Sequence, residues 1–116
     1  MLNGDCMILV IGGSYQGKTE YVTSNFSGYK FFNQLHLFIK KRLEEGCGEG
    51  AILDEIHEAI KDGDWVLIAD EIGNGIVPMD ENDNKWREVS GRILIELAKE
   101  AEEVHRVVLG IGQRIK

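Results

Sequence analysis

Eight consecutive residues near the N-terminus have the types and spacing of a phosphate-binding loop. They read GGSYQGKT and match the pattern G-x-x-x-x-G-K-S/T with no mismatch. In this pattern the glycines let the backbone bend around a phosphate, and the next helix N-terminus adds partial positive charge. We therefore predict that nucleotide phosphates bind to Gly12, Gly13, Ser14, Tyr15, Gln16, Gly17, Lys18 and Thr19.

Within this loop, the lysine and the threonine have distinct chemical roles. Lys18 would give a full positive charge to the β- and γ-phosphates, and the Thr19 hydroxyl would ligate Mg²⁺. The alternative interpretation is a glycine-rich turn between a strand and a helix that binds nothing. The flanking strand and helix patterns favour the functional interpretation.

Two carboxylates follow a second apolar segment, WVLIA at residues 65–69. Asp70 is placed to hold Mg²⁺ through water, and Glu71 to orient or deprotonate a substrate hydroxyl. Ligands of open α/β sheets bind at the carboxyl ends of the strands, which favours function over the alternative of two acids that begin a solvated loop. Lys18 and Glu71 are thus the predicted catalytic residues, and Thr19 and Asp70 the predicted magnesium ligands.

These side chains need a sheet with helices on both faces to bring them together. The apolar runs at 6–11 and 65–69 have the composition of strands buried on both faces, as in a parallel sheet. Further strands are predicted at 29–32 and 104–111, with helices at 18–24, 34–45, 51–61 and 85–103 and a long loop at 72–84. This alternation predicts one α/β domain over residues 1–116, a three-layer P-loop NTPase fold with a mostly parallel sheet of four to five strands.

Composition excludes several classes of protein. The formal net charge of -7 argues against nucleic-acid binding through general surface charge. The longest apolar run is too short to span a bilayer, and the N-terminal residues do not have the pattern of a signal peptide. Cys6 and Cys47 have no disulfide or zinc spacing, so we expect a protein of the reducing cytoplasm, with Cys6 as a buried structural thiol.

The three histidines stand apart from one another in the sequence. His57 and His105 are predicted at the surface or at helix edges. His36 lies beside an apolar helix face, where a structural role is favoured over a catalytic one.

Several motifs in the same order resemble the bifunctional adenosylcobinamide kinase/adenosylcobinamide-phosphate guanylyltransferase family of cobalamin biosynthesis. That family begins with a strand and a GG-x-x-x-GKS/T loop, and its later N-E-V-G-x-G-I-V-P pattern is similar to DEIGNGIVP at 70–78. Its R-D-x-x-G-R motif resembles REVSGR at 87–92, and its final G-I-G-x-x-I-K resembles GIGQRIK at 110–116. The resemblance covers roughly residues 7–24 and 65–116.

The resemblance implies a kinase that uses Mg²⁺ with ATP or GTP and moves a phosphoryl group to the hydroxyl of adenosylcobinamide, a corrinoid. It also implies a homo-oligomer, in the family a trimer. Family members are longer, and carry a histidine that takes the guanylyl group within a segment H-x-x-x-R-P-x-x-W-x-T. His36 is the one histidine in the corresponding region, but that segment is absent around it, so we assign it no role in guanylyl transfer.

Two other functions remain open at the level of sequence. One is a nucleotide-binding module, such as a regulator, that keeps the loop without catalysis. The other is a small kinase that acts on a different alcohol. The choice between ATP and GTP is also open.

Overall fold

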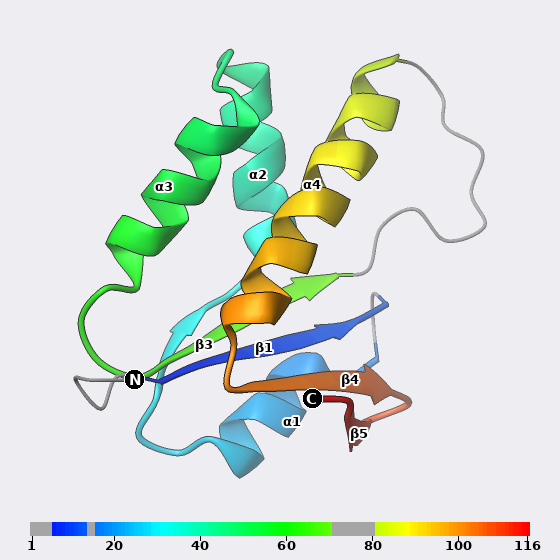
Figure 1. Ribbon diagram of the computed structural model, residues 1–116. Coiled ribbons are helices and arrows are strands. Elements are labelled where there is room, and N and C mark those ends of the chain that lie inside the picture. The colour runs from blue at the N-terminus through cyan, green and yellow to red at the C-terminus, as the bar shows by residue number, and fades with distance from the viewer. Residues whose placement is uncertain (1–5, 14–15, 71–80) are drawn as a thin grey trace.

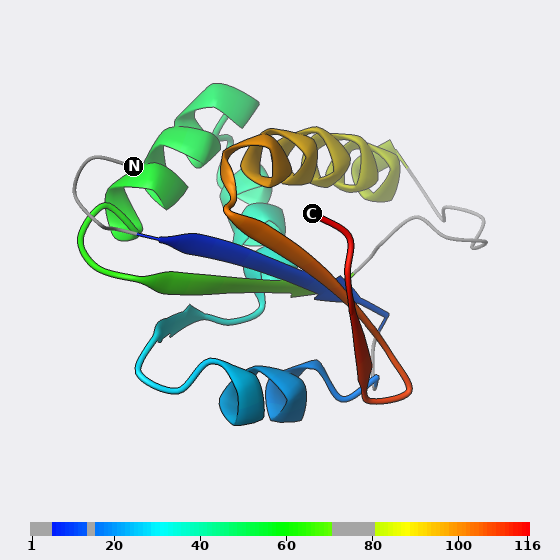
Figure 2. The ribbon, with the colours of Figure 1, turned by 60° about the horizontal axis from the view of Figure 1, so that its bottom comes forward.

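The computed structural model describes residues 6–13, 16–70 and 81–116 as a three-layer α/β protein. A five-stranded sheet lies between α1 on one face and α2, α3 and α4 on the other (Figures 1 and 2). The sequence prediction of a three-layer fold with four to five strands is therefore confirmed. The elements are β1 (Met7–Gly12), α1 (Lys18–Asn25), β2 (Lys30–Phe32), α2 (Leu35–Glu44), α3 (Glu49–Ala59), β3 (Trp65–Asp70), α4 (Glu81–Glu100), β4 (Glu103–Val108) and β5 (Ile111–Arg114).

The sheet has the strand order β2-β3-β1-β4-β5. The first four strands run parallel, and β5 pairs antiparallel with β4. Because β1 is central and β3 is its parallel neighbour, the ends of these two strands meet at one edge, where Gly12 pairs with Asp70. The phosphate loop and the acidic end of β3 are thereby brought side by side.

Alternation along the central strand supplies a core to each face of the sheet. Met7 and Leu9 pack with the α2, α3 and α4 side, whereas Ile8 and Val10 pack with Val22 and Phe26 around α1. This two-sided burial explains why β1 is a continuous apolar run rather than an alternating one. The predicted inward stripe of α4 is also confirmed, since its members are buried or partly buried: Trp86, Val89, Ile93, Leu97 and Ala101.

The prediction of a single last strand over 104–111 is wrong. The chain instead turns at Leu109 and Gly110, which have φ angles of 53° and 77°, and returns as β5. The predicted helix at 85–103 is shifted, because α4 begins at Glu81 and Glu103 already belongs to β4. Among the described residues, no helix combines the length and the apolar character that crossing a bilayer requires.

Candidate functional site

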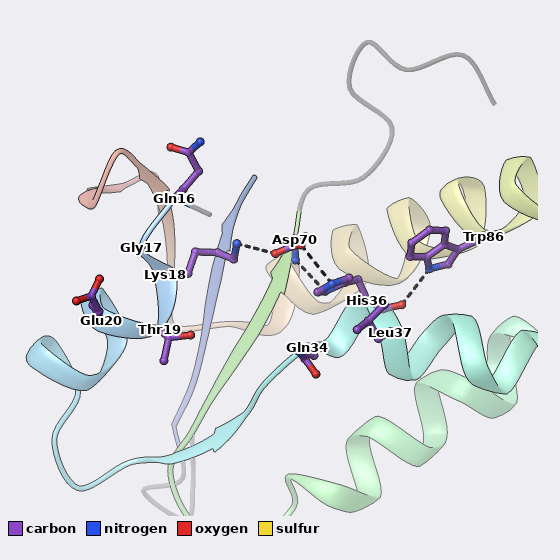
Figure 3. A pocket seen from close by; sticks show the side chains of 10 residues that line it. All are labelled: Gln16, Gly17, Lys18, Thr19, Glu20, Gln34, His36, Leu37, Asp70 and Trp86. Atoms are coloured by element: carbon purple, nitrogen blue, oxygen red, sulfur yellow. Dashed lines mark hydrogen bonds and ion pairs between the residues drawn. The ribbon is translucent and has the colours of Figure 1, made fainter. Parts of the chain in front are cut away.

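The site is a pocket of about 630 Å³ at the carboxyl ends of β1 and β3. It is lined by residues from the phosphate loop and α1, from the start of α2, from the end of β3 and from α4 (Figure 3). Of the predicted site residues it brings together Gln16, Gly17, Lys18, Thr19 and Asp70. Ser14, Tyr15 and Glu71 lie outside the described residues, so their predicted roles stay predictions.

Lys18 is the electrostatic centre of this pocket. Its side chain is buried, with 8% exposure, and its Nζ donates to the carbonyl oxygen of Gly13 at 2.7 Å. The same Nζ lies 2.6 Å from Oδ1 of Asp70. The loop lysine and the β3 carboxylate, 52 positions apart in the chain, thus form one ion pair, as the dashed line in Figure 3 shows.

Gly12 has a packing role that its position in the motif does not reveal. A Cβ at this residue would lie 2.5 Å from the carbonyl oxygen of Val107 on β4, too close for any side chain. The first glycine of the motif, which ends β1, is therefore required for the close approach of β1 to β4. Gly17, with φ of 83°, takes the left-handed conformation directly before α1, which a glycine adopts without strain.

His36 is a part of the site that sequence reasoning did not assign. The backbone N–H of Asp70 donates to its Nδ1 at 3.0 Å, and its Nε2 lies 3.3 Å from Oδ2 of Asp70. With Nδ1 accepting, the proton of the neutral ring lies on Nε2, which faces the carboxylate. Both ring nitrogens therefore hold Asp70, and the predicted structural role of His36 is that of a support for the site carboxylate.

Burial is the largest influence on the pKa of His36 and lowers it from the ordinary value of 6.5. The charge of Asp70 raises this pKa, and the charge of Lys18 lowers it. The net effect is a lower pKa, because the ring is enclosed between α2 and β3, where an imidazolium loses its hydration. The neutral ring is thus the form that the site favours.

The far side of the pocket is formed by Trp86, Leu37 and Gln34, which the sequence did not indicate. Trp86 donates from Nε1 to the carbonyl oxygen of His36 at 2.9 Å, which ties α4 to the start of α2. The ammonium of Lys40 lies 4.8 Å from the centroid of the Trp86 ring. This side of the pocket joins an apolar wall to a positive charge, next to the ion pair of Lys18 and Asp70.

His105 corrects another expectation, since it is neither isolated nor at the surface. It is buried on β4, and its Nδ1 shares a hydrogen bond of 2.9 Å with the Tyr21 hydroxyl while Nε2 lies 2.7 Å from Oε1 of Glu103. His57 is at a helix surface as predicted, where it contacts Glu100. Cys6, predicted as buried, is only partly so, and its thiol receives a long contact of 3.9 Å from the Tyr29 hydroxyl.

Within the described parts of the chain, no three histidine, cysteine or acidic side chains converge as a metal cage. Mg²⁺ does not need such a cage, because it is usually held by substrate phosphates and water together with one or two protein oxygens. Thr19 and Asp70 both line the pocket and would supply those oxygens.

The parallel strands, the phosphate loop and the carboxylate at the end of β3 define a protein of the P-loop class of α/β folds. A family model described as cobinamide kinase / cobinamide phosphate guanyltransferase matches residues 32–115, so the chain belongs to that family. The match begins after the loop at 12–19 and includes the middle of the chain, where the motifs of the sequence analysis showed no resemblance.

Two curated relatives are similar to part of the chain. The bifunctional adenosylcobalamin biosynthesis proteins CobU of Salmonella typhimurium strain LT2 and of Escherichia coli strain K12 are each 45% identical to it over 51 residues. The aligned segment is 44% of this chain and only 28% of each relative.

Proposed function

We propose that this protein is a nucleotide-dependent kinase that transfers the γ-phosphoryl group of ATP or GTP to the hydroxyl of adenosylcobinamide. The observation that carries the proposal is the ion pair between Lys18 and Asp70 at the adjoining ends of β1 and β3. Membership of the cobinamide kinase family supports the choice of acceptor. The names of the relatives place those proteins in adenosylcobalamin biosynthesis.

Phosphoryl transfer needs positioning and charge more than covalent chemistry from the protein. Lys18 would exchange its partner Asp70 for the phosphates of the nucleotide, because a phosphate carries more negative charge than a single carboxylate. His36 would keep Asp70 in place during this exchange, through its bond to the Asp70 backbone N–H. Glu71, next in the chain, is proposed to orient the acceptor hydroxyl.

Asp70 and Thr19 would hold the magnesium ion, whose chemistry is to neutralise charge on the transferring phosphate. The apolar wall of Trp86 and Leu37 is open to the acceptor on the opposite side of Asp70 from the loop (Figure 3). The pocket therefore has a phosphate end and an acceptor end, with Asp70 between them.

Guanylyl transfer requires a nucleophile. His36 has both ring nitrogens directed at Asp70, so the geometry favours phosphoryl transfer over a guanylylated His36. The second candidate is a nucleotide-binding module without catalysis, which is favoured by the sequence around His36, where the R-P-x-x-W segment of the family is absent.

One assay separates the two candidates. Purified protein would be incubated with Mg-ATP or Mg-GTP and cobinamide, and phosphorylated cobinamide sought by mass spectrometry. We expect product. Nucleotide binding without product would reject kinase activity on cobinamide and favour the binding module.

Lys18→Ala tests the phosphate site itself. We expect nucleotide affinity to fall by about 10- to 100-fold, the usual effect of losing a hydrogen bond from a charged group, as measured by calorimetric titration. Lys61→Ala is the matched control, because Lys61 lies on the surface beside Glu58. Unchanged affinity in Lys18→Ala, with circular dichroism showing a folded protein, would contradict the assignment of the loop.

A further inference from the structure

The turn between β4 and β5 makes direct contact with the phosphate loop. The N–H of Gly110 donates to the backbone oxygen of Gln16 at 2.7 Å, and the N–H of Leu109 donates to the side-chain Oε1 of the same Gln16 at 2.6 Å. Two successive amides of the turn are thus bound to one loop residue, 93 positions away in the case of Leu109.

The backbone of this turn is unusual for its sequence. Leu109 and Gly110 both have positive φ, as in the two-residue turns that usually carry Asn-Gly. A leucine in the left-handed region is strained, and this side chain is 80% exposed, so little packing within the described chain offsets the strain. Strain of this kind occurs where the surrounding structure requires the conformation, and here the two-residue connection between β4 and β5 requires positive φ while the pair of bonds to Gln16 holds the turn against the loop.

A close backbone approach continues this contact at the next residue of the loop. A Cβ at Gly17 would lie 3.2 Å from the Cα of Gly110, so the loop and the turn are packed together without a side chain between them. One helical turn further on, the Tyr21 ring occupies the space beside Gly112 on β5. The hairpin of β4 and β5 therefore lies along the last part of the loop and the first turn of α1.

We propose that Gln16 is a positioning residue, and that its two bonds to the Leu109–Gly110 turn hold the end of the phosphate loop in one conformation before a nucleotide binds. The loop then loses less conformational freedom on binding phosphate, which raises affinity without any direct contact from the hairpin. This inference rests on the nucleotide binding proposed above. It gives the C-terminal GIG segment a role that the pocket lining does not reveal.

The decisive variant is Gln16→Met, which keeps the length of the side chain and removes the acceptor for the Leu109 N–H. Binding of ATP, of GTP and of inorganic tripolyphosphate would be measured by calorimetric titration. We expect all three affinities to fall by the same factor, about 5- to 10-fold, the effect of one hydrogen bond. Gln113→Met on β5 is the matched control and should leave all three affinities unchanged.

Tripolyphosphate separates positioning of the loop from direct contact of Gln16 with the nucleoside. If Gln16 instead bound the nucleoside, Gln16→Met would weaken ATP and GTP but leave tripolyphosphate unchanged, and the inference would be wrong. It would also be wrong if wild type and Gln16→Met bound all three equally well. Failure of the wild type to bind any of them would instead reject the proposed function, and the positioning role with it.

Hydrogen exchange in the ligand-free protein gives an independent readout. The Leu109 amide should exchange faster in Gln16→Met than in wild type, while amides of β1 keep their protection. Leu109→Asn retains the N–H and suits the left-handed turn, so it should keep both the slow exchange and the wild-type affinity. A loss of affinity in Leu109→Asn equal to that in Gln16→Met would assign the effect to the leucine side chain and overturn the inference.

Discussion

At the scale of single residues, His36 connects the stability of the protein to the geometry of its site. Its Nδ1 accepts a hydrogen bond from the backbone N–H of Asp70. No sequence pattern predicts this bond, because the partners are 34 positions apart. The apolar helix face beside His36 predicted a structural role, and the bond to Asp70 is consistent with one. The sequence did not reveal that the structure being supported is the site carboxylate.

The lowered pKa of His36 leads to a pH prediction. Because the folded-state pKa lies below the unfolded value of 6.5, the neutral ring stabilises the protein fully above that value, and this stability is lost as pH falls through the folded pKa. Urea unfolding from pH 8 to pH 5 should therefore show a steeper decline in wild type than in His36→Asn, which cannot titrate there. Parallel declines would show that His36 is not held in its neutral form.

A second substitution isolates the hydrogen bond from the titration. His36→Leu removes the acceptor for the Asp70 N–H, whereas His36→Asn still offers a carbonyl oxygen. At pH 8 we expect His36→Leu to be about 1 kcal/mol less stable than His36→Asn in urea unfolding. Equal stabilities would mean that the bond contributes little.

At the scale of elements, the sequence predicted the buried strands well and the hairpin badly. MILVIG and WVLIAD are apolar runs bounded by glycine or acid, and local composition alone identifies them. The reversal at Leu109 and Gly110 carries a leucine, which is not typical of such turns, and its contacts with Gln16 join residues that are far apart in the chain. The pairing of His105 with Tyr21 and the pocket wall at Trp86 also depend on contacts between residues far apart in the chain, so the sequence did not reveal them.

Packing of the hairpin against α1 can be tested at Gly112. A Cβ there would overlap the Tyr21 ring, so in Gly112→Ala the ring must move and give up its hydrogen bond to His105. We expect a loss of about 1–3 kcal/mol in thermal or urea unfolding.

Gly91→Ala makes the same chemical change in α4, where the new methyl group meets no neighbour. We expect it to stabilise the protein by about 0.5–1 kcal/mol, because alanine is the better helix former. If the free energy of unfolding fell in Gly112→Ala by no more than it changes in Gly91→Ala, the tight packing at β5 would be contradicted.

At the scale of the whole molecule, apolar side chains gather on the last hairpin and the residues after it. Leu109, Ile111 and Ile115 are 80%, 73% and 55% exposed, and β5 is an edge strand (Figure 1). The family resemblance implied a homo-oligomer, and such a surface is typical of contacts between subunits. We therefore expect copies of this chain to associate through β5.

Light scattering coupled to size-exclusion chromatography tests this expectation. Ile111→Lys should convert the oligomer to a monomer at micromolar concentration, because a buried lysine would be uncompensated at the interface. Ile95→Lys, at an isoleucine of α4 that is 57% exposed, should leave the mass unchanged. A wild type that is monomeric, or equal masses for the two variants, would exclude β5 as the interface.

The position of β1 at the centre of the sheet has a consequence for synthesis on the ribosome. Its neighbours are residues 65–70 and 103–106, so β1 gains its second partner only after residues 103–106 have been made. The hydrogen bonds of Gln16 form later still, because their donors are in residues 109 and 110. Pairings this distant form late in folding. A chain interrupted before residue 103 would therefore carry the whole GGSYQGKT segment and yet lack β4 and the contacts of Gln16, so we expect the proposed nucleotide binding to depend on residues 103–110 as well as on the local motif.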